Sequence, residues 1–223
     1  MRILVINPVG HPRWDEQDRK IYLSYASTET AVDVYSLPRG PPSVESPEAH
    51  AEVIPLVVER AVHLHSNYDA VIVNCFLDPA VDILKSILRK PVIGPCEASL
   101  ALASALSRKI AIVTVGNEAL WMIEERVRHL GYLGYLVSLK GIRLTVLQLD
   151  ENKEKTKSEV TKKAKEAVSE GAEVIVLGCT GLSGLAKEVQ DALGTPVIDP
   201  SGAALKVAES MVKLGLFNPR APD

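Results

Sequence analysis

Cysteine is scarce in this chain: three of its 223 residues are cysteines, and no C-x-x-C pair occurs among them. An odd number of cysteines without that spacing argues against a disulfide framework, so we expect thiols rather than disulfides. The position of each thiol, at Cys75, Cys96 and Cys179, is therefore a question about function.

Long apolar runs, a strong net charge and nucleotide-binding motifs are also missing. No stretch of 18 apolar residues occurs, so the sequence predicts no membrane-spanning helix. The formal net charge is −3 and no basic run is interleaved with aromatic residues, which argues against nucleic acid or an anionic membrane as a partner. No G-x-G-x-x-G or P-loop pattern supports nucleotide binding. The first apolar run is too short for a signal peptide, and we expect a cytoplasmic protein.

What the chain does contain is an alternation of short apolar runs with segments of helical length. Hydrophobic residues make up 47% of the sequence, enough for a sizeable core. Residues 118–130 carry apolar side chains at helical spacing, and the charged residues 151–171 predict a solvated helix ending at Gly171. Apolar strands that alternate with helices are typical of an α/β fold with parallel sheets covered on both faces. The predicted strands are residues 2–7, 31–36, 70–74, 91–94, 109–115, 143–149, 173–177 and 196–199.

Eight strands form either one closed barrel or two four-stranded sheets, and an internal repeat favours two sheets. The stretch "VIVNCFLDPAVDILKSILRKPVIGPCEASLALA" matches "VIVLGCTGLSGLAKEVQDALGTPVIDPSGAALKVA", and "RILVIN" matches "KIAIVT". We therefore expect two three-layer αβα domains related by a pseudo-two-fold axis, with an active site in the cleft between them. The predicted domains are residues 1–97 with 203–223, which carry Cys75, and residues 98–202, which carry Cys179.

Cys75 and Cys179 occupy equivalent positions in the two copies, at the carboxyl end of a strand and before a helix. Ligands of open α/β sheets bind at that edge, and a helix N-terminus favours the thiolate form of a nearby cysteine. The alternative is that each thiol is a small buried hydrophobe at a strand end. Two thiols at one repeated position favour a functional pair. Cys96 has Ser201 at its equivalent position, so the repeat requires no thiol there.

The motifs "VIVNCFLDPAVD" and "LGCTGL" resemble the two cysteine motifs of the aspartate/glutamate/hydantoin racemase superfamily. "GPPSVES" at residues 40–46 is similar to a Gly-Pro-x-Ser-Ile-Glu segment of the hydantoin/allantoin racemase branch. "GPCEASL" at residues 94–100 is similar to the segment that crosses between the family's domains. The likeness covers nearly the whole chain. It departs from the family at residues 9–14, "VGHPRW", where hydantoin racemases usually carry Asn-Thr-Ser, and at Val115, where the family often has threonine.

The resemblance implies cofactor-independent racemisation of an amino-acid derivative by two bases, without a metal. One thiolate of the pair Cys75 and Cys179 removes the hydrogen from the stereogenic carbon, and the other thiol returns a proton on the opposite face. Inversion needs an acid and a base on opposite faces, so this chemistry agrees with the paired thiols. Backbone N–H groups after each cysteine are expected to stabilise the carbanion. The implied substrate-binding residues are Asn7, Phe76, Thr114, Thr180 and Gly181.

The implied partners are a small-molecule substrate and further copies of the chain in a homo-oligomer. A 5-substituted hydantoin or allantoin-like ring is the preferred substrate, because its hydrogen is more acidic than that of a free amino acid. The alternatives are an aspartate- or glutamate-type racemase, or a maleate isomerase or arylmalonate decarboxylase-like enzyme on the same fold. A non-enzymatic two-lobed binding protein, in which the cysteines only pack, is a further class. Metal binding by His63 and His65 is disfavoured, since side chains two residues apart diverge on a helix.

Overall fold

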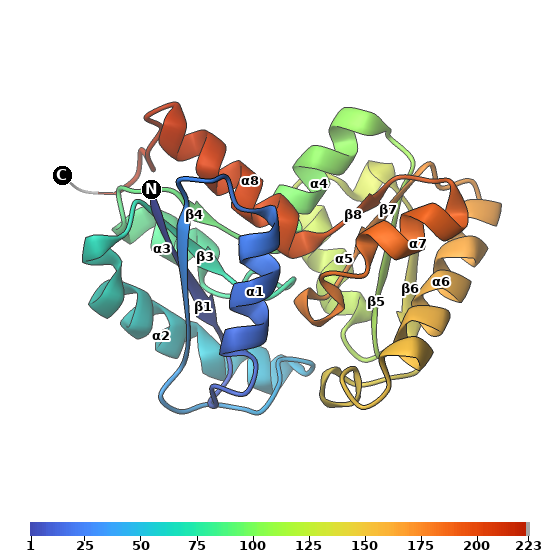
Figure 1. Ribbon diagram of the computed structural model, residues 1–223, viewed down its shortest axis with the longest axis horizontal. Coiled ribbons are helices and arrows are strands. Elements are labelled where there is room, and N and C mark those ends of the chain that lie inside the picture. The colour runs from blue at the N-terminus through green and yellow to red at the C-terminus, as the bar shows by residue number, and fades with distance from the viewer. Residues whose placement is uncertain (222–223) are drawn as a thin grey trace. The chain divides into compact units, whose positions relative to one another are not determined.

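The computed structural model describes residues 1–221 and shows an α/β protein with two four-stranded parallel sheets, each flanked by helices (Figure 1). The predicted fold class is therefore confirmed, as is the choice of two sheets over one barrel. The chain divides into two compact units. Unit 1 contains Met1–Val44, Glu48–Pro95 and the chain from Ser201 onward, and unit 2 contains Glu45–Pro47 and Cys96–Pro200. The predicted domains, residues 1–97 with 203–223 and residues 98–202, stay a prediction.

The sheet of unit 1 has the strand order β2-β1-β3-β4, with every pairing parallel. Every position of β1 after Arg2 is buried, as is all of β3, because central parallel strands are covered on both faces. The strands are β1 (Arg2–Asn7), β2 (Ala31–Ser36), β3 (Ala70–Val73) and β4 (Val92–Ile93). The helices are α1 (Asp15–Tyr25), α2 (Pro47–Leu64), α3 (Val81–Ile87) and α8 (Pro200–Lys213).

The two faces of this sheet are covered by different helices. Leu4 and Ile6 belong to a core cluster that includes Val57 of α2 and Leu84 of α3. Successive side chains of a strand point to opposite faces of the sheet. Ile3 and Val5 therefore point to the face opposite to that of Leu4 and Ile6. Figure 1 shows α1 in front of that sheet. Hydrogen bonds from Asn7, the last residue of β1, to Asp15 and Asp18 tie this strand end to the first turn of α1.

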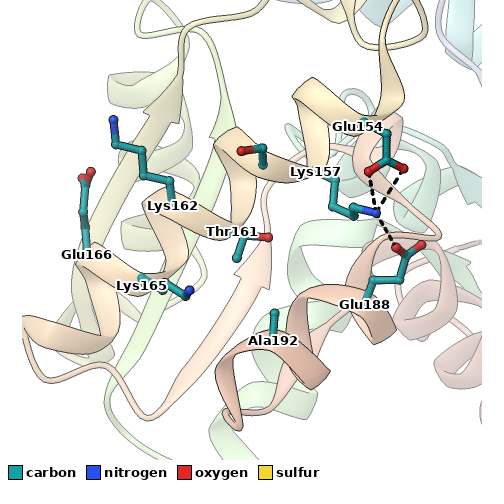
Figure 2. Close-up of a pocket in the computed structure, with 9 residues that line it drawn as sticks. Glu154, Lys157, Thr161, Lys162, Lys165, Glu166, Glu188 and Ala192 are labelled. Carbon is teal, nitrogen blue, oxygen red and sulfur yellow. Dashed lines mark hydrogen bonds and ion pairs between the residues drawn. The ribbon is translucent and has the colours of Figure 1, made fainter.

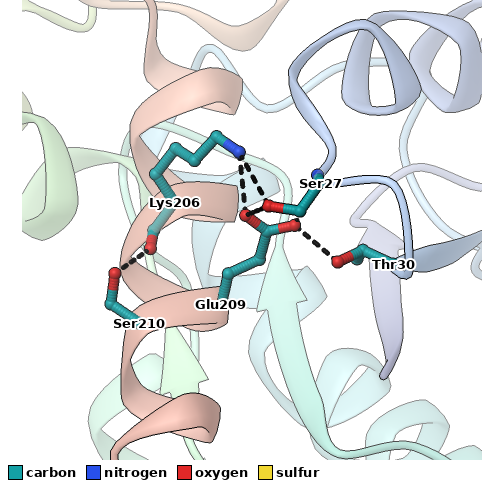
Figure 3. Close-up of polar contacts among 5 residues, drawn as sticks. All are labelled: Ser27, Thr30, Lys206, Glu209 and Ser210. Carbon is teal, nitrogen blue, oxygen red and sulfur yellow. Dashed lines mark hydrogen bonds and ion pairs between the residues drawn. The ribbon is translucent and has the colours of Figure 1, made fainter.

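Glu209 anchors α8 to the loop after α1 (Figure 3). Its carboxylate accepts hydrogen bonds from the backbone and hydroxyl of Ser27, both at 2.8 Å, from the Thr30 hydroxyl at 2.6 Å and from Lys206 Nζ at 2.8 Å. The side chain is only 4% exposed. Burial acts to raise the pKa of Glu209, but the hydrogen bonds from Lys206, Thr30 and Ser27 outweigh it and lower the pKa to about 2. Glu209 is therefore ionised at neutral pH and stabilises unit 1 in that form.

The sheet of unit 2 has the corresponding order β6-β5-β7-β8, again parallel throughout. Val160 of α6 and Val189 of α7 share a core cluster with Ala111 and Val113 of β5, so these two helices cover one face. The strands are β5 (Ile110–Val115), β6 (Leu136–Ile142), β7 (Val174–Leu177) and β8 (Val197–Ile198). The helices are α4 (Pro95–Leu106), α5 (Leu120–His129), α6 (Lys153–Ser169) and α7 (Ala186–Leu193).

One strand prediction is wrong: residues 143–149 do not form a strand. The strand that pairs with β5 is Leu136–Ile142, and Val146–Gln148 forms a 3₁₀ turn. A capping box starts this turn, because the Thr145 side chain accepts from the backbone of Gln148 and the Gln148 side chain accepts from the backbone of Thr145. These reciprocal bonds satisfy the free backbone N–H groups of Thr145 and Gln148 within the turn itself. The apolar residues around the turn therefore do not pair with a neighbouring strand. Among residues 1–221, no helix has the length and apolar character needed to cross a membrane.

Candidate active site

In unit 1 the two central strands end in a pair of hydrogen-bonded asparagines. The Asn74 N–H continues the ladder to Ile6 O at 2.8 Å, and the Asn74 side chain donates to Asn7 Oδ1 at 2.7 Å. Tyr22 of α1 donates its hydroxyl to Asn74 Oδ1 at 2.9 Å. All three side chains are buried. Asn74, the residue that precedes Cys75, is therefore held in place by β1 and by α1.

Two carboxylates of α1 complete this network. Asn7 Nδ2 donates to Asp15 at 3.0 Å and to Asp18 at 2.9 Å, and Asp15 also accepts from the Ser36 hydroxyl. Both carboxylates lie in the first turn of α1, where the helix dipole favours negative charge. Both N–H groups of the Asn7 amide are thus used within unit 1. The role of Asn7 in holding substrate stays a prediction. In the structure, Asn7 links the ends of β1 and β3 to α1.

Cys75 begins a tight loop rather than a helix. Its N–H donates to Val73 O at 2.8 Å and its carbonyl accepts from Asp78 N–H at 3.0 Å. Asp78 and Ala80 adopt positive φ angles of 49° and 63°, which L-residues seldom take without support from their surroundings. The helix expected directly after the cysteine begins only at Val81. The effect of its N-terminus on the Cys75 thiol stays a prediction.

The same loop is held against the end of β4. A β-carbon at Gly94 would overlap the carboxyl group of Asp78, so the Asp78 side chain packs directly against this glycine. Phe76, the predicted carbanion-stabilising residue, is 3% exposed, whereas Cys75 is half-buried. The thiol therefore lies at the border between the packed interior and the surface.

In unit 2 the corresponding strand ends are joined by a similar pair of bonds. The Gly178 N–H continues the ladder to Val113 O at 2.7 Å, and the Thr114 hydroxyl donates to Gly178 O at 2.7 Å. A β-carbon at Gly178 would lie 2.5 Å from Ile112 Cγ2 and 2.9 Å from Thr114 Cβ, so the two strands approach too closely for a side chain. Thr114 is 1% exposed, and its substrate-binding role stays a prediction.

Cys179 begins a 3₁₀ turn, Thr180–Leu182, and its carbonyl accepts from Leu182 N–H at 3.0 Å. Thr180 and Cys179 are half-buried, and Gly181 is exposed. A β-carbon at Gly181 would lie 3.5 Å from the Cys179 sulfur. Helix α7 begins at Ala186, so here too a loop separates the cysteine from the α-helix that was expected directly after it.

The loop after Cys179 is fixed at its far end. The Gly184 N–H donates to an Asp199 carboxylate oxygen at 2.6 Å, which ties the loop to the residue that follows β8. Asp199 is itself buried. As in unit 1, the loop that carries the thiol is thus held to the end of the neighbouring strand.

The structure brings the predicted residues together in two groups. Asn7, Cys75 and Phe76 lie at the carboxyl edge of the unit 1 sheet, and Thr114, Cys179, Thr180 and Gly181 lie at that edge of the unit 2 sheet. Each cysteine comes two residues after the last strand residue, Val73 or Leu177. The thiols of Cys75, Cys96 and Cys179 are unbridged, and Cys96 is completely buried.

Sequence reasoning missed the polar residues that support the unit 1 edge, namely Asp15, Asp18, Tyr22 and Asn74. Asp15, Asp18 and Tyr22 are spaced by three and four residues, which places them on one face of a helix. That spacing, together with the position of the helix directly after β1, was a usable signal.

Unit 2 has a groove between α6 and α7, with a volume of about 740 Å³ (Figure 2). Lys157 bridges Glu154 at 2.8 Å and Glu188 at 2.9 Å, and these hydrogen bonds raise the pKa of Lys157. Lysines and glutamates are equally frequent in the lining. This mixture of signs is typical of a solvated helix face, as predicted for residues 151–171, and it favours no ligand.

A second pocket of unit 2, of about 290 Å³, lies at the carboxyl ends of β5 and β6. It is lined by strand ends and by the loops that follow them, including Val115, Ile142 and Arg143, and also by Glu45. The pocket therefore lies at the same edge of the unit 2 sheet as Cys179. Within residues 1–221, no cluster of three or more histidine, cysteine, aspartate or glutamate side chains is arranged to hold a metal ion.

Comparison with known proteins identifies the family. The model of the Asp/Glu/Hydantoin racemase family matches residues 19–208. The chain is 35% identical over 224 residues to a hydantoin racemase of Paenarthrobacter aurescens, covering 99% of this chain and 95% of that one. It is 31% identical to a hydantoin racemase of Rhizobium meliloti, over 96% of this chain and 90% of the relative. The crystal structure of allantoin racemase from Pseudomonas fluorescens matches with a TM-score of 0.95 at 28% identity, over 100% of this chain and 97% of that one. These matches confirm the resemblance seen in the cysteine motifs, and the chain belongs to the Asp/Glu/hydantoin racemase family.

Proposed function

We propose that this protein is a cofactor-independent racemase of 5-substituted hydantoins or allantoin-like rings, with Cys75 and Cys179 as its two bases. One observation carries the proposal: each thiol stands two residues past a central strand, at the same place in two sheets of the same strand order. Two relatives named hydantoin racemase and a structure named allantoin racemase support the substrate class.

The proposed reaction inverts the ring carbon that lies between a carbonyl and a nitrogen. A thiolate of one cysteine accepts the proton from this carbon, and the electron pair moves into the neighbouring carbonyl as an enolate. The thiol of the other cysteine then donates a proton to the opposite face. The product is the other enantiomer, and the two cysteines have exchanged protonation states, so no external reactant is consumed. Both thiols are half-buried, which suits groups that must meet a substrate.

The remaining predicted residues have supporting roles in this proposal. Gly181 is exposed next to the Cys179 sulfur, a position from which its N–H can approach the enolate oxygen. Phe76 and Thr180 follow their cysteines in the same way. Asn7 and Thr114 fix the strand ends beside the thiols through their hydrogen bonds, and we propose that they affect substrate binding through that support.

The test is racemisation of a panel of substrates in D2O. Enantiomerically enriched 5-alkylhydantoins, allantoin, aspartate and glutamate are incubated with the enzyme, and loss of optical rotation and deuterium uptake at the stereogenic carbon are measured. Exchange coupled to loss of rotation for the ring compounds alone is the expected result. Exchange only with free amino acids, or with no compound, contradicts the proposed substrate class.

The cysteine roles are tested by the matched set Cys75→Ser, Cys179→Ser and Cys96→Ser. The first two substitutions are expected to lower kcat by about 100-fold or more, the range typical of losing a positioned acid or base. Cys96→Ser is the control, because Cys96 is fully buried and lies outside the proposed site. Near-wild-type racemisation by either of the first two variants contradicts the two-base mechanism.

A further inference from the structure

The pocket at the carboxyl ends of β5 and β6 adjoins the position of Cys179. In the unit 2 sheet, Val115 pairs with Ile142 on one side, and Val113 pairs with Leu177 on the other. Cys179 follows Leu177 by two residues and is therefore level with Val115. Neighbouring strands of a sheet lie about 4.8 Å apart, so Cys179 follows the strand directly beside β5, whose last residue Val115 lines the pocket.

The 3₁₀ turn Val146–Gln148 provides a second link between the pocket and the thiol. Gln148 lines the pocket, and the next residue, Leu149, packs on the Cys179 side. A β-carbon at Gly181 would lie 2.7 Å from Leu149 Cδ1 and 3.5 Å from the Cys179 sulfur. A substrate that reacts at Cys179 can therefore place one of its substituents in this pocket. A volume of about 290 Å³ corresponds to roughly ten water molecules at about 30 Å³ each, which is ample for a small substituent.

The pocket combines a cation with carboxylates. The guanidinium of Arg143 is exposed and forms no hydrogen bond or ion pair with other residues in the described part of the chain. Glu45 is half-buried, and its Oε1 accepts from the Val146 N–H at 2.9 Å. Glu118 adds a second, exposed carboxylate. Arginine supplies only donors and a carboxylate supplies only acceptors, so the lining matches a group that carries both.

We propose that this pocket binds the substituent on the stereogenic carbon and selects a ureido-type group, with Arg143 donating to its carbonyl and Glu45 accepting from its N–H groups. The inference rests on the proposed racemase function. A urea is neutral, so it fits a lining of mixed charge better than an anionic or cationic substituent does. An alkyl substituent would remove water from these polar groups without replacing its hydrogen bonds, and such sites discriminate strongly against apolar analogues.

The test compares two hydantoins whose 5-substituents have the same number of heavy atoms, allantoin with a ureido group and 5-isobutylhydantoin. kcat and KM are measured by polarimetry for wild type, Arg143→Ala and Glu45→Gln. Arg143→Ala is expected to lower kcat/KM for allantoin by about 10- to 100-fold, mainly through KM, and to change that for 5-isobutylhydantoin by less than about threefold. Glu45→Gln keeps an acceptor for Val146 but loses the charge, and a smaller, equally selective loss of about three- to tenfold is expected.

Arg128→Ala is the matched control. Arg128 is a half-exposed arginine of the same unit, and within residues 1–221 its ion pairs are with Glu124 and Glu125 of its own helix. Its loss is expected to leave the racemisation of both substrates unaffected. Equal losses on both substrates, no loss on either, or a wild-type enzyme that prefers 5-isobutylhydantoin would overturn the pocket assignment alone. A wild-type enzyme that racemises neither hydantoin would overturn the proposed function and the assignment with it.

Discussion

Replacing Glu209 with glutamine is expected to remove a pH-dependent part of the stability of unit 1. The pKa of Glu209 lies at about 2, compared with an ordinary value of 4.5. A carboxyl group whose pKa is depressed by folding stabilises the folded state above the ordinary pKa, and this stabilisation is lost as the pH falls toward the folded value. At about 1.4 kcal/mol per pH unit the full contribution is about 3 kcal/mol, of which about 2 kcal/mol is lost between pH 5.5 and pH 3.

The assay is urea unfolding followed by circular dichroism at several pH values from 5.5 to 3. The free energy of unfolding of wild type minus that of Glu209→Gln is expected to be largest at pH 5.5 and to shrink by about 2 kcal/mol at pH 3. Subtracting the variant cancels the titration of all other carboxylates. Glu59→Gln, which replaces an exposed carboxylate of the same unit, is the control substitution. Parallel curves for wild type and Glu209→Gln would refute the reasoning from the hydrogen bonds of Ser27, Thr30 and Lys206.

Two further substitutions test the packing around the strand ends and the C-terminal segment. Gly178→Ala inserts a β-carbon 2.5 Å from Ile112 Cγ2 and is expected to destabilise the fold by about 1–3 kcal/mol and to lower kcat about 10- to 100-fold by displacing Cys179. Thermal unfolding and racemisation are the measurements, and Gly134→Ala, where a β-carbon meets no atom within 4 Å, is the control; equal behaviour of the two variants would contradict the close approach. Asn218→Ala removes donors to Leu88 O at 2.8 Å and Lys90 O at 2.6 Å and is expected to cost about 2–3 kcal/mol in urea unfolding with activity unchanged, and unaltered stability would contradict the anchoring role.

The sequence predicted the central strands well because burial on both faces leaves a plain signature. β1 and β5 are continuous β-branched and aliphatic runs, and their bounds agree with the predicted residues 2–7 and 109–115 to within one residue. The strand predicted at 143–149 failed for a reason that is also visible locally. Strand β6 lies at the edge of its sheet with mostly half-buried side chains, so it has no strong apolar pattern. The apolar residues next to it belong to a turn started by the capping box of Thr145 and Gln148.

The polar support of the candidate site was harder to predict because it depends on contacts distant in sequence. Asn74 is bound by Asn7, 67 residues away, and by Tyr22, 52 residues away. The sequence identifies the cysteines because their motif is repeated. No sequence pattern predicts that these three side chains are in contact. The segment Glu45–Pro47 is a similar case, since it belongs to unit 2 although the chain on both sides belongs to unit 1. Only the folded chain brings Glu45 to the backbone of Val146.

The two strand ends show what the internal repeat has retained. In unit 1 the pair before the cysteine is Asn7 and Asn74, and in unit 2 it is Thr114 and Gly178, so no side chain is shared. The backbone bond from the residue before the cysteine is nevertheless the same, 2.8 Å to Ile6 O and 2.7 Å to Val113 O, and in each unit one further bond involving a side chain joins the two strand ends. Both copies therefore share the hydrogen-bonded arrangement of the two strand ends that precede the thiol. A thiol that only filled space would not require the same rigid approach in two differently built surroundings, and this favours Cys75 and Cys179 as a functional pair.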